Sequence, residues 1–265
     1  MFARILTVGI CATMVLVGTT AAQGDMTFLA SNEYILYRGN PDQGFASFEF
    51  DIKIRAMHYD AAADTTYAFS DHGVGDPTMV YRIENPVSGI PALTPYASLS
   101  RLYGTAALTD DGLCGFSSDA LYYIDLEDPA NPIETYVGNT GVANIGASAY
   151  DPTTDTLYIM GFTTNSLYIV NQETAAVELV GSLGISSEGL GGDWYDGEIY
   201  LLAQNISTNR LELGKVDQTT GEFFAQSVLA NDSRNVATGL VVLPEPSASM
   251  LLGALLAGMS IFRRR

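Results

Sequence analysis

One unit of this 265-residue sequence recurs, and its clearest copy is Asp151-Pro-Thr-Thr-Asp-Thr-Leu-Tyr-Ile-Met-Gly-Phe162. A polar turn of Asp, Pro and Thr leads into an apolar run containing Tyr and Ile, which is typical of a turn followed by a β-strand. A second strand follows in Ser166-Leu-Tyr-Ile-Val-Asn-Gln-Glu-Thr174 and ends in another polar turn. The stretch therefore predicts two consecutive strands joined by a turn.

The first strand and its turn return in three other places along the chain. The copies are Asp64-Thr-Thr-Tyr-Ala-Phe69, Asp111-Gly-Leu-Cys-Gly-Phe116 and Asp196-Gly-Glu-Ile-Tyr-Leu201. With the aspartates at 64, 111, 155 and 196 aligned, the intervals are 47, 44 and 41 residues. A period in the low forties with about four short strands per unit is typical of β-propeller blades, which bury both faces by stacking against neighbouring blades.

The segment before each turn is rich in small residues, as expected for a strand that lies near a crowded central axis. The segments span 55–60, 103–109, 145–150 and 189–195, and a fifth copy at 236–243 has no unit after it. The N-terminal part, 26–51, resembles a unit that lacks its first strand. The two incomplete units complete each other.

We therefore predict an all-β fold, a β-propeller of about five four-stranded blades that is closed when 236–243 joins the N-terminal unit. Closure removes the open edges that a linear sheet would expose. A β-sandwich or a β-rich solenoid could be built from the same short strands and is the alternative. The repeated tyrosines, such as Tyr81, Tyr122, Tyr158, Tyr168 and Tyr200, are expected to pack between blades rather than to stack on carbohydrate.

The first 22 residues have the pattern of a secretory signal peptide. Arg4 precedes an apolar run at 5–17, and small residues at Thr20 and Ala22 offer a cleavage site before Gln23. The apolar run is too short to be a convincing membrane span. The sequence thus predicts three parts: a signal peptide at 1–22, the propeller at 23–243 and a C-terminal segment at 244–265.

That last segment has three components in order. They are Pro244, Glu245 and Pro246, then an uncharged apolar run at 247–262, then Arg263, Arg264 and Arg265. As a helix the run would span about 24 Å against roughly 30 Å of hydrocarbon, so it predicts a short single membrane-spanning helix. Lysine and arginine favour the cytoplasmic side, which would place the residues before Pro244 on the exported side.

The order of these components resembles the PEP-CTERM sorting signal of exported bacterial proteins. The resemblance covers about the last two dozen residues only. It implies recognition by an exosortase, a membrane enzyme thought to process the tail near the motif, in bacteria that make extracellular polysaccharide. With signal peptidase at the other end, it implies a protein sorted to the cell envelope or released into the extracellular matrix.

The body at 23–243 carries 8 basic and 29 acidic residues, a formal charge of −21. Such a charge makes nucleic acid and anionic lipid surfaces poor partners, since both are polyanions. Its single cysteine, Cys114, lies in a strand pattern and is expected to be a small core residue. With one thiol and no internal disulfide, the body must be held together by core packing.

Ionisable residues are scarce in the segments expected at the axis. They are His58 and Asp193, with Trp194 beside the latter. Convergence of these two in one channel pocket would favour catalysis or a channel metal. The structural alternative is a hydrogen-bonded histidine and a turn-capping aspartate. No motif of a known catalytic nucleophile, zinc site, phosphate loop or dinucleotide site is present, so no catalytic residue is assigned.

The acidic turns are candidate calcium-binding sites. Candidates are the turn from Asp125 to Asp128, Asp217, and the loop 70–77 with His72. None has the regular ligand spacing of a dedicated calcium loop, and aspartate and glycine are also the residues that tight turns select. The expectation is therefore no obligate cofactor.

Together these patterns predict an exported, non-enzymatic binding or structural module whose partner is an extracellular polysaccharide or protein. The alternative, from a different class, is a propeller hydrolase or lactonase acting on an extracellular sugar or ester.

Overall fold

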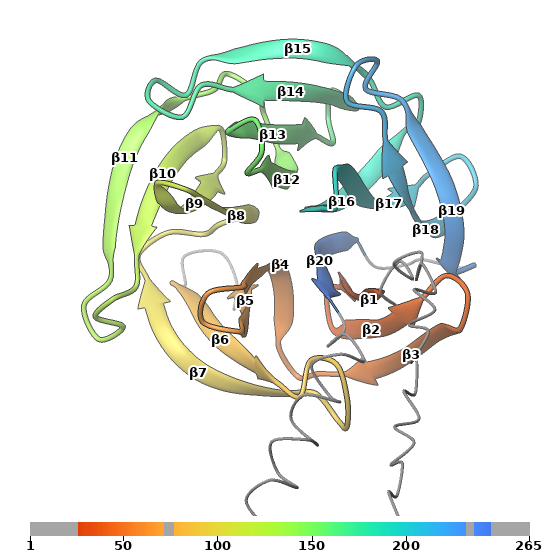
Figure 1. Ribbon diagram of the computed structural model, residues 1–265, viewed down its shortest axis with the longest axis horizontal. Coiled ribbons are helices and arrows are strands. Elements are labelled where there is room, and N and C mark those ends of the chain that lie inside the picture. The colour runs from red at the N-terminus through yellow and green to blue at the C-terminus, as the bar shows by residue number, and fades with distance from the viewer. Residues whose placement is uncertain (1–25, 72–76, 232–235, 245–265) are drawn as a thin grey trace, which may run out of the picture. The chain divides into compact units, whose positions relative to one another are not determined.

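The computed structural model describes residues 26–71, 77–231 and 236–244 and shows five four-stranded antiparallel sheets arranged around a common axis (Figure 1). Those residues contain no helix, and hence none long and apolar enough to cross a membrane. The expected signal peptide at 1–22, the apolar run at 247–262 and its flanking residues Glu245, Pro246 and Arg263–Arg265 lie outside the described residues.

Each blade has four strands in order from the axis to the rim. The innermost strands are β4 (Lys53–Asp60), β8 (Thr105–Thr109), β12 (Ile145–Asp151), β16 (Ser187–Tyr195) and β20 (Ala237–Pro244). The second strands are β5 (Thr65–Asp71), β9 (Gly112–Ser117), β13 (Thr156–Gly161), β17 (Glu198–Asn205) and β1 (Met26–Asn32). The third strands are β6 (Thr78–Glu84), β10 (Ala120–Asp125), β14 (Ser166–Val170), β18 (Arg210–Val216) and β2 (Ile35–Asn40). The outermost strands are β7 (Ala92–Leu99), β11 (Ile133–Asn139), β15 (Val177–Ser182), β19 (Phe223–Ala230) and β3 (Gly44–Glu49).

The ring is closed by the two ends of the described chain. Strand β20 is hydrogen-bonded to β1 and supplies the inner strand of the sheet β20-β1-β2-β3. The expected closure and the five blades are thus confirmed, and the sandwich and solenoid alternatives are wrong. The closing strand runs one residue further than expected, because Pro244 is paired with Met26 at its end.

Side-chain hydrogen bonds at the start of β20 reinforce this closure. The Thr238 hydroxyl donates to the carbonyl oxygen of Ile54 at 2.5 Å, on the neighbouring inner strand β4. The same hydroxyl lies 3.0 Å from Ser31 Oγ on β1. The Thr238 side chain is buried, so this contact links two adjacent blades away from solvent.

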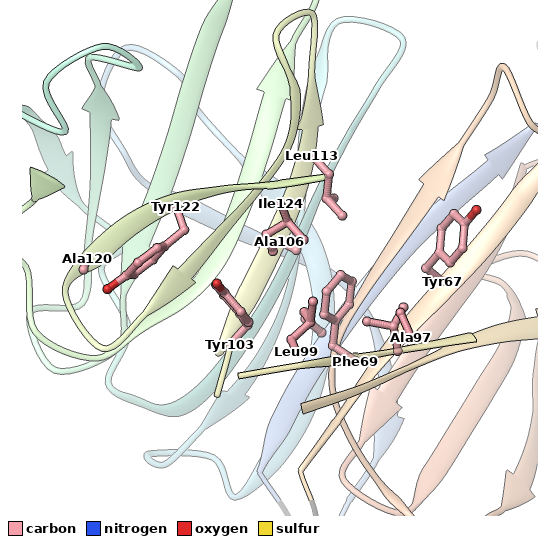
Figure 2. Packing of buried hydrophobic residues seen from close by; sticks show 12 residues of the cluster. Tyr67, Phe69, Ala97, Leu99, Tyr103, Ala106, Leu113, Ala120, Tyr122 and Ile124 are labelled. Atoms are coloured by element: carbon pink, nitrogen blue, oxygen red, sulfur yellow. The ribbon is translucent and has the colours of Figure 1, made fainter. Parts of the chain in front are cut away.

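The core is divided into five hydrophobic clusters, one between each pair of neighbouring blades. Figure 2 shows the cluster between the β4–β7 and β8–β11 blades, where Tyr67 and Phe69 face Leu113 and Ile124. Alternate residues of a strand enter different clusters, since side chains alternate across a sheet. The five repeated tyrosines each pack in a different interface, as expected: Tyr81, Tyr122, Tyr158, Tyr168 and Tyr200.

Small residues allow the inner strands to approach one another. A Cβ atom on Gly191 of β16 would lie 2.6 Å from the carbonyl carbon of Gly239 on β20. Non-bonded carbon atoms at optimal separation are about 3.5–4.0 Å apart, so no larger residue fits there. This contact explains the small residues that the sequence places near the axis.

Three of the four recurring aspartates are explained by the turns that follow the inner strands. Asp64, Asp155 and Asp196 have positive φ angles of 47°, 51° and 50°, a conformation in which aspartate and asparagine are enriched. In two of these turns the carboxylate also accepts a hydrogen bond from the tyrosine five residues earlier, at 2.9 Å in each case: Tyr59 to Asp64 and Tyr150 to Asp155. We call the side of the ring that carries these turns, at 61–64, 110–111, 152–155 and 196–197, the turn face.

Candidate functional site

A cavity of about 340 Å³ lies on the turn face where the five inner strands end, and we call it the axial cavity. Each inner strand contributes to its wall, through His58, Thr109, Tyr150, Asp193 and Val242 among others. The two residues singled out in the sequence, His58 and Asp193, therefore line one cavity although they lie on different blades.

His58 lies on β4 with only 9% of its surface exposed. Burial lowers the pKa of its imidazole to about 4, although the Asp60 carboxylate acts in the opposite direction. The imidazole is therefore neutral at ordinary pH. Its Nε2 atom has no hydrogen-bond partner among the described residues, so the hydrogen bond that the structural alternative expects of this histidine is not seen at Nε2.

Asp193 does not cap a turn, as the structural alternative expected, but lies within β16 and joins two inner strands. Its Oδ2 accepts the backbone N–H of Val242 on β20 at 2.7 Å, and its Oδ1 accepts the N–H of Trp194 at 2.9 Å. Desolvation by burial raises the pKa of Asp193 to about 7, and the two N–H groups reduce this effect. The carboxyl thus titrates near neutral pH while bound to backbone on both oxygens.

A second cavity of about 530 Å³ opens on the same face between the β4–β7 and β8–β11 blades, and we call it the interblade cavity. It shares His58 and Leu108 with the axial cavity, so the two cavities adjoin. Its volume is within the range of about 300–1,000 Å³ that is common for small-molecule sites.

The wall of the interblade cavity combines aromatic and acidic side chains. The acidic residues are Asp60, Asp111, Asp125 and Glu127, and the aromatic residues are Tyr67, Tyr96 and Tyr123. No lysine or arginine lines it in the part of the chain that the structure describes. The cavity therefore has a negative wall with apolar surfaces between the carboxylates.

Tyr96 is fixed across the interface between the two blades. Its hydroxyl donates to the carbonyl oxygen of Leu126 at 3.3 Å, and its ring centroid lies 5.4 Å from that of Tyr67. The Arg82 guanidinium lies 4.1 Å from the Tyr96 ring centroid, a cation–π distance. These contacts hold one aromatic wall of the cavity in place.

The acidic turns considered for calcium bind their own backbone. Asp217 Oδ1 accepts the N–H groups of Thr219 and Thr220 at 2.8 and 2.9 Å, and bonding to Thr219 lowers the Asp217 pKa to about 2. The Asp128 carboxylate accepts the backbone N–H of Ala130 and the side-chain Nδ2–H of Asn131. Residues 72–76, with His72, lie outside the described part of the chain.

Within the described ranges, no group of three or more His, Cys, Asp or Glu side chains is close enough to hold a metal ion. The residues of the interblade cavity come from several strands and occupy different positions in the repeat. The sequence singled out His58 as an axial candidate, Asp111 as a repeated turn residue and the turn from Asp125 to Asp128, which contains Glu127, as a calcium candidate. Nothing in the sequence connected these residues with one another or with Tyr96. These residues meet only because two blades stack.

The fold and its two cavities define a five-bladed β-propeller with a concave turn face. No protein-family model and no curated protein matches the sequence. Among solved structures, a chain of the crystal structure of a nidogen/laminin complex matches with a TM-score of 0.55 and 11% identity, over 82% of this chain and 98% of that one. A structural genomics protein of unknown function from Bacteroides thetaiotaomicron VPI-5482 matches with a TM-score of 0.45 and 19% identity, over 76% of this chain and half of that one. At such identities the first likeness shows the fold alone.

Proposed function

We propose that this propeller is a non-enzymatic binding module that presents its turn face to an extracellular ligand. One observation carries the proposal: two adjoining cavities on that face share His58 and Leu108 and together form a concave surface of aromatic and acidic side chains. Concave sites with apolar walls and a few polar groups are the usual form of ligand sites.

The chemistry of the two axial candidates supports binding over catalysis. His58 is neutral and mostly buried, and both carboxylate oxygens of Asp193 already hold backbone N–H groups. A general base must be within hydrogen-bond reach of the proton that it abstracts. The backbone bonds of Asp193 therefore give this carboxyl a structural role.

Binding can be tested with one substitution that obstructs the interblade cavity. Thr135 is an exposed residue of β11 that lines this cavity, so Thr135→Arg should add a long cationic side chain there without changing the core. Ser98→Arg adds the same charge at an exposed position of β7 outside both cavities. The immobilised mature protein would be incubated with extracellular polysaccharide and surface proteins of the producing cells, and retention measured.

Retention by the wild type and the Ser98 variant, with loss in the Thr135 variant, is the expected result. Equal retention by all three proteins would contradict a binding role for this face.

Export and sorting form the second part of the proposal and rest on the two ends of the sequence. The N-terminal 22 residues have signal-peptide features, and the tail resembles a PEP-CTERM signal processed by an exosortase. We propose that the protein is sorted to the envelope or released into the matrix. Its formal charge of −18 makes polysaccharide or protein a better partner than nucleic acid.

Sorting can be separated from folding because the closing strand ends at Pro244. Pro246→Ala changes the motif beyond that strand, and Pro129→Ala in the turn before β11 is the control. Cell fractionation with immunoblotting should show mis-sorting of the Pro246 variant only. Normal localisation of that variant would contradict the sorting proposal.

A hydrolase or lactonase remains the second candidate, favoured by one specific observation. His58 and Asp193 line the same cavity, and a carboxyl with a pKa of about 7 is suited to general acid–base work near neutral pH. Hydrolysis of aryl esters or lactones that is abolished by Asp193→Asn in a folded protein would establish this alternative. No turnover above buffer with either protein would count against it.

A further inference from the structure

We propose that the interblade cavity binds a small organic cation, an amine or ammonium group carried on an apolar or aromatic body. The inference deepens the proposed binding function and rests on it. It assigns the ligand class from the wall of the cavity.

Charge is the first reason. Two carboxylates of the wall, Asp111 and Glu127, are exposed and take part in no hydrogen bond or ion pair with the described residues. In the other two acidic residues, Asp60 and Asp125, one oxygen accepts backbone N–H groups of the following turn at 2.8–3.0 Å. The wall therefore holds four negative side chains that no lysine or arginine of the described wall neutralises.

Aromatic and apolar surface is the second reason. Tyr67 and Tyr123 offer aromatic surface, and aromatic rings attract cations through their quadrupoles, while Leu108 and Leu113 offer apolar contact. The Tyr96 ring shows that this wall accepts a cation, because the Arg82 guanidinium already lies 4.1 Å from its centroid. A hydrated metal ion would make no use of these surfaces. An amine on an apolar body would use both the carboxylates and the rings.

His58 supplies an independent indication that the wall is incomplete. It lines the cavity, is 9% exposed, and its Nε2 has no partner in the described part of the chain. A buried nitrogen of this kind usually has a hydrogen-bond partner, because leaving it unpaired costs about 1–3 kcal/mol. A bound ligand in the cavity is one source of that partner.

The carboxylates do not group as a metal site would require, which separates an organic cation from a divalent ion. In the described chain, no three acidic or histidine side chains converge on one point. Carboxylates distributed around a cavity of about 530 Å³ suit a molecule that spans it better than an ion about 2 Å from each ligand.

Isothermal titration calorimetry of the mature protein at low ionic strength tests this assignment. The probes are phenethylamine, its neutral isostere 2-phenylethanol and the anion phenylacetate. We expect the amine to bind at least about fivefold more tightly than the alcohol, and the anion not to bind. Added salt should weaken the binding of the amine, because it screens the attraction between charges.

Adjacent residues of one turn provide a matched pair of variants. Asp111 lines the interblade cavity, whereas its neighbour Asp110, which is also exposed, lines the axial cavity. Asp111→Asn and Glu127→Gln should each lower the affinity for the amine about twofold to fivefold. Asp110→Asn makes the same change in net charge and should lower the affinity less. Both lining positions are exposed, so folding should persist, and near-ultraviolet circular dichroism would check it.

Equal affinity for amine and alcohol would overturn the assignment, as would an equal effect of the Asp110 and Asp111 variants. Failure to bind any amine by a protein that still retains polysaccharide or surface protein would overturn the ligand class and leave the binding function standing.

Discussion

The backbone N–H of Val242 donates to the Asp193 carboxylate at 2.7 Å, and this bond joins the inner strands of the last blade and the closing blade. Strand β20 is also held by its ladder with β1, but that ladder lies within one blade. The Asp193 bond therefore supports closure of the ring at a point where two blades meet.

Loss of this acceptor should weaken the whole ring. Asp193→Ala leaves the N–H groups of Val242 and Trp194 without their acceptor, so we expect the free energy of unfolding to fall by about 1–3 kcal/mol. Urea denaturation followed by tryptophan fluorescence measures the change. Glu188→Ala, an exposed position on the same strand, is the control and should change stability by less than about 0.5 kcal/mol.

Asp193 and His58 should give opposite pH dependence over the same range. Folded Asp193 keeps its proton up to about pH 7, whereas an unfolded carboxyl releases it near pH 3.9, so its contribution to stability falls as pH rises from about 4 to 7. Folded His58 stays neutral down to about pH 4, whereas an unfolded imidazole binds a proton near pH 6.5, so its contribution falls as pH decreases. In the wild type these two contributions largely cancel.

Substitution of either residue should therefore reveal how the other makes the free energy of unfolding change with pH. Between about pH 4.5 and 6.5, Asp193→Asn should make stability rise with pH, and His58→Gln should make it fall, each by about 1–3 kcal/mol. Urea unfolding at several pH values measures both slopes. Curves for the two variants that run parallel to the wild type would contradict the assigned pKa shifts.

The close contact between β16 and β20 predicts a strong size limit at Gly191. A methyl group there would lie 2.6 Å from the backbone of Gly239, so Gly191→Ala must separate two inner strands and should cost about 1–3 kcal/mol. Gly146→Ala is a milder control, because its nearest contact is a Phe162 side-chain atom at 3.1 Å. Thermal unfolding should show a clearly lower Tm for the first variant, and equal Tm values would argue against the close approach.

The sequence alone was sufficient for the repeat, the five blades and the closing strand, because four blades repeat the same alternation of strand residues and turn aspartates and the two ends of the body supply complementary parts of the fifth. The sequence did not predict which residues meet in the two cavities. The Val242 bond to Asp193 joins residues 49 positions apart, and the Tyr96 bond to Leu126 joins two blades. Contacts of this kind depend on how blades stack, and no local pattern encodes the distance between them.

Cys114 should report on opening of the ring. Its side chain is fully buried on β9, and burial raises the pKa of the thiol to about 12, so almost no reactive thiolate is present in the folded protein. In the mature protein, from which Cys11 is expected to have been removed, maleimide at pH 8 should label Cys114 only in the small population of molecules that are open. Subdenaturing urea should accelerate labelling in proportion to the unfolded population.

Ala130→Cys, at an exposed turn position, should react at once in the same assay. Rapid labelling of Cys114 without denaturant would show that the interface between the β8–β11 and β12–β15 blades, where this thiol packs, opens locally.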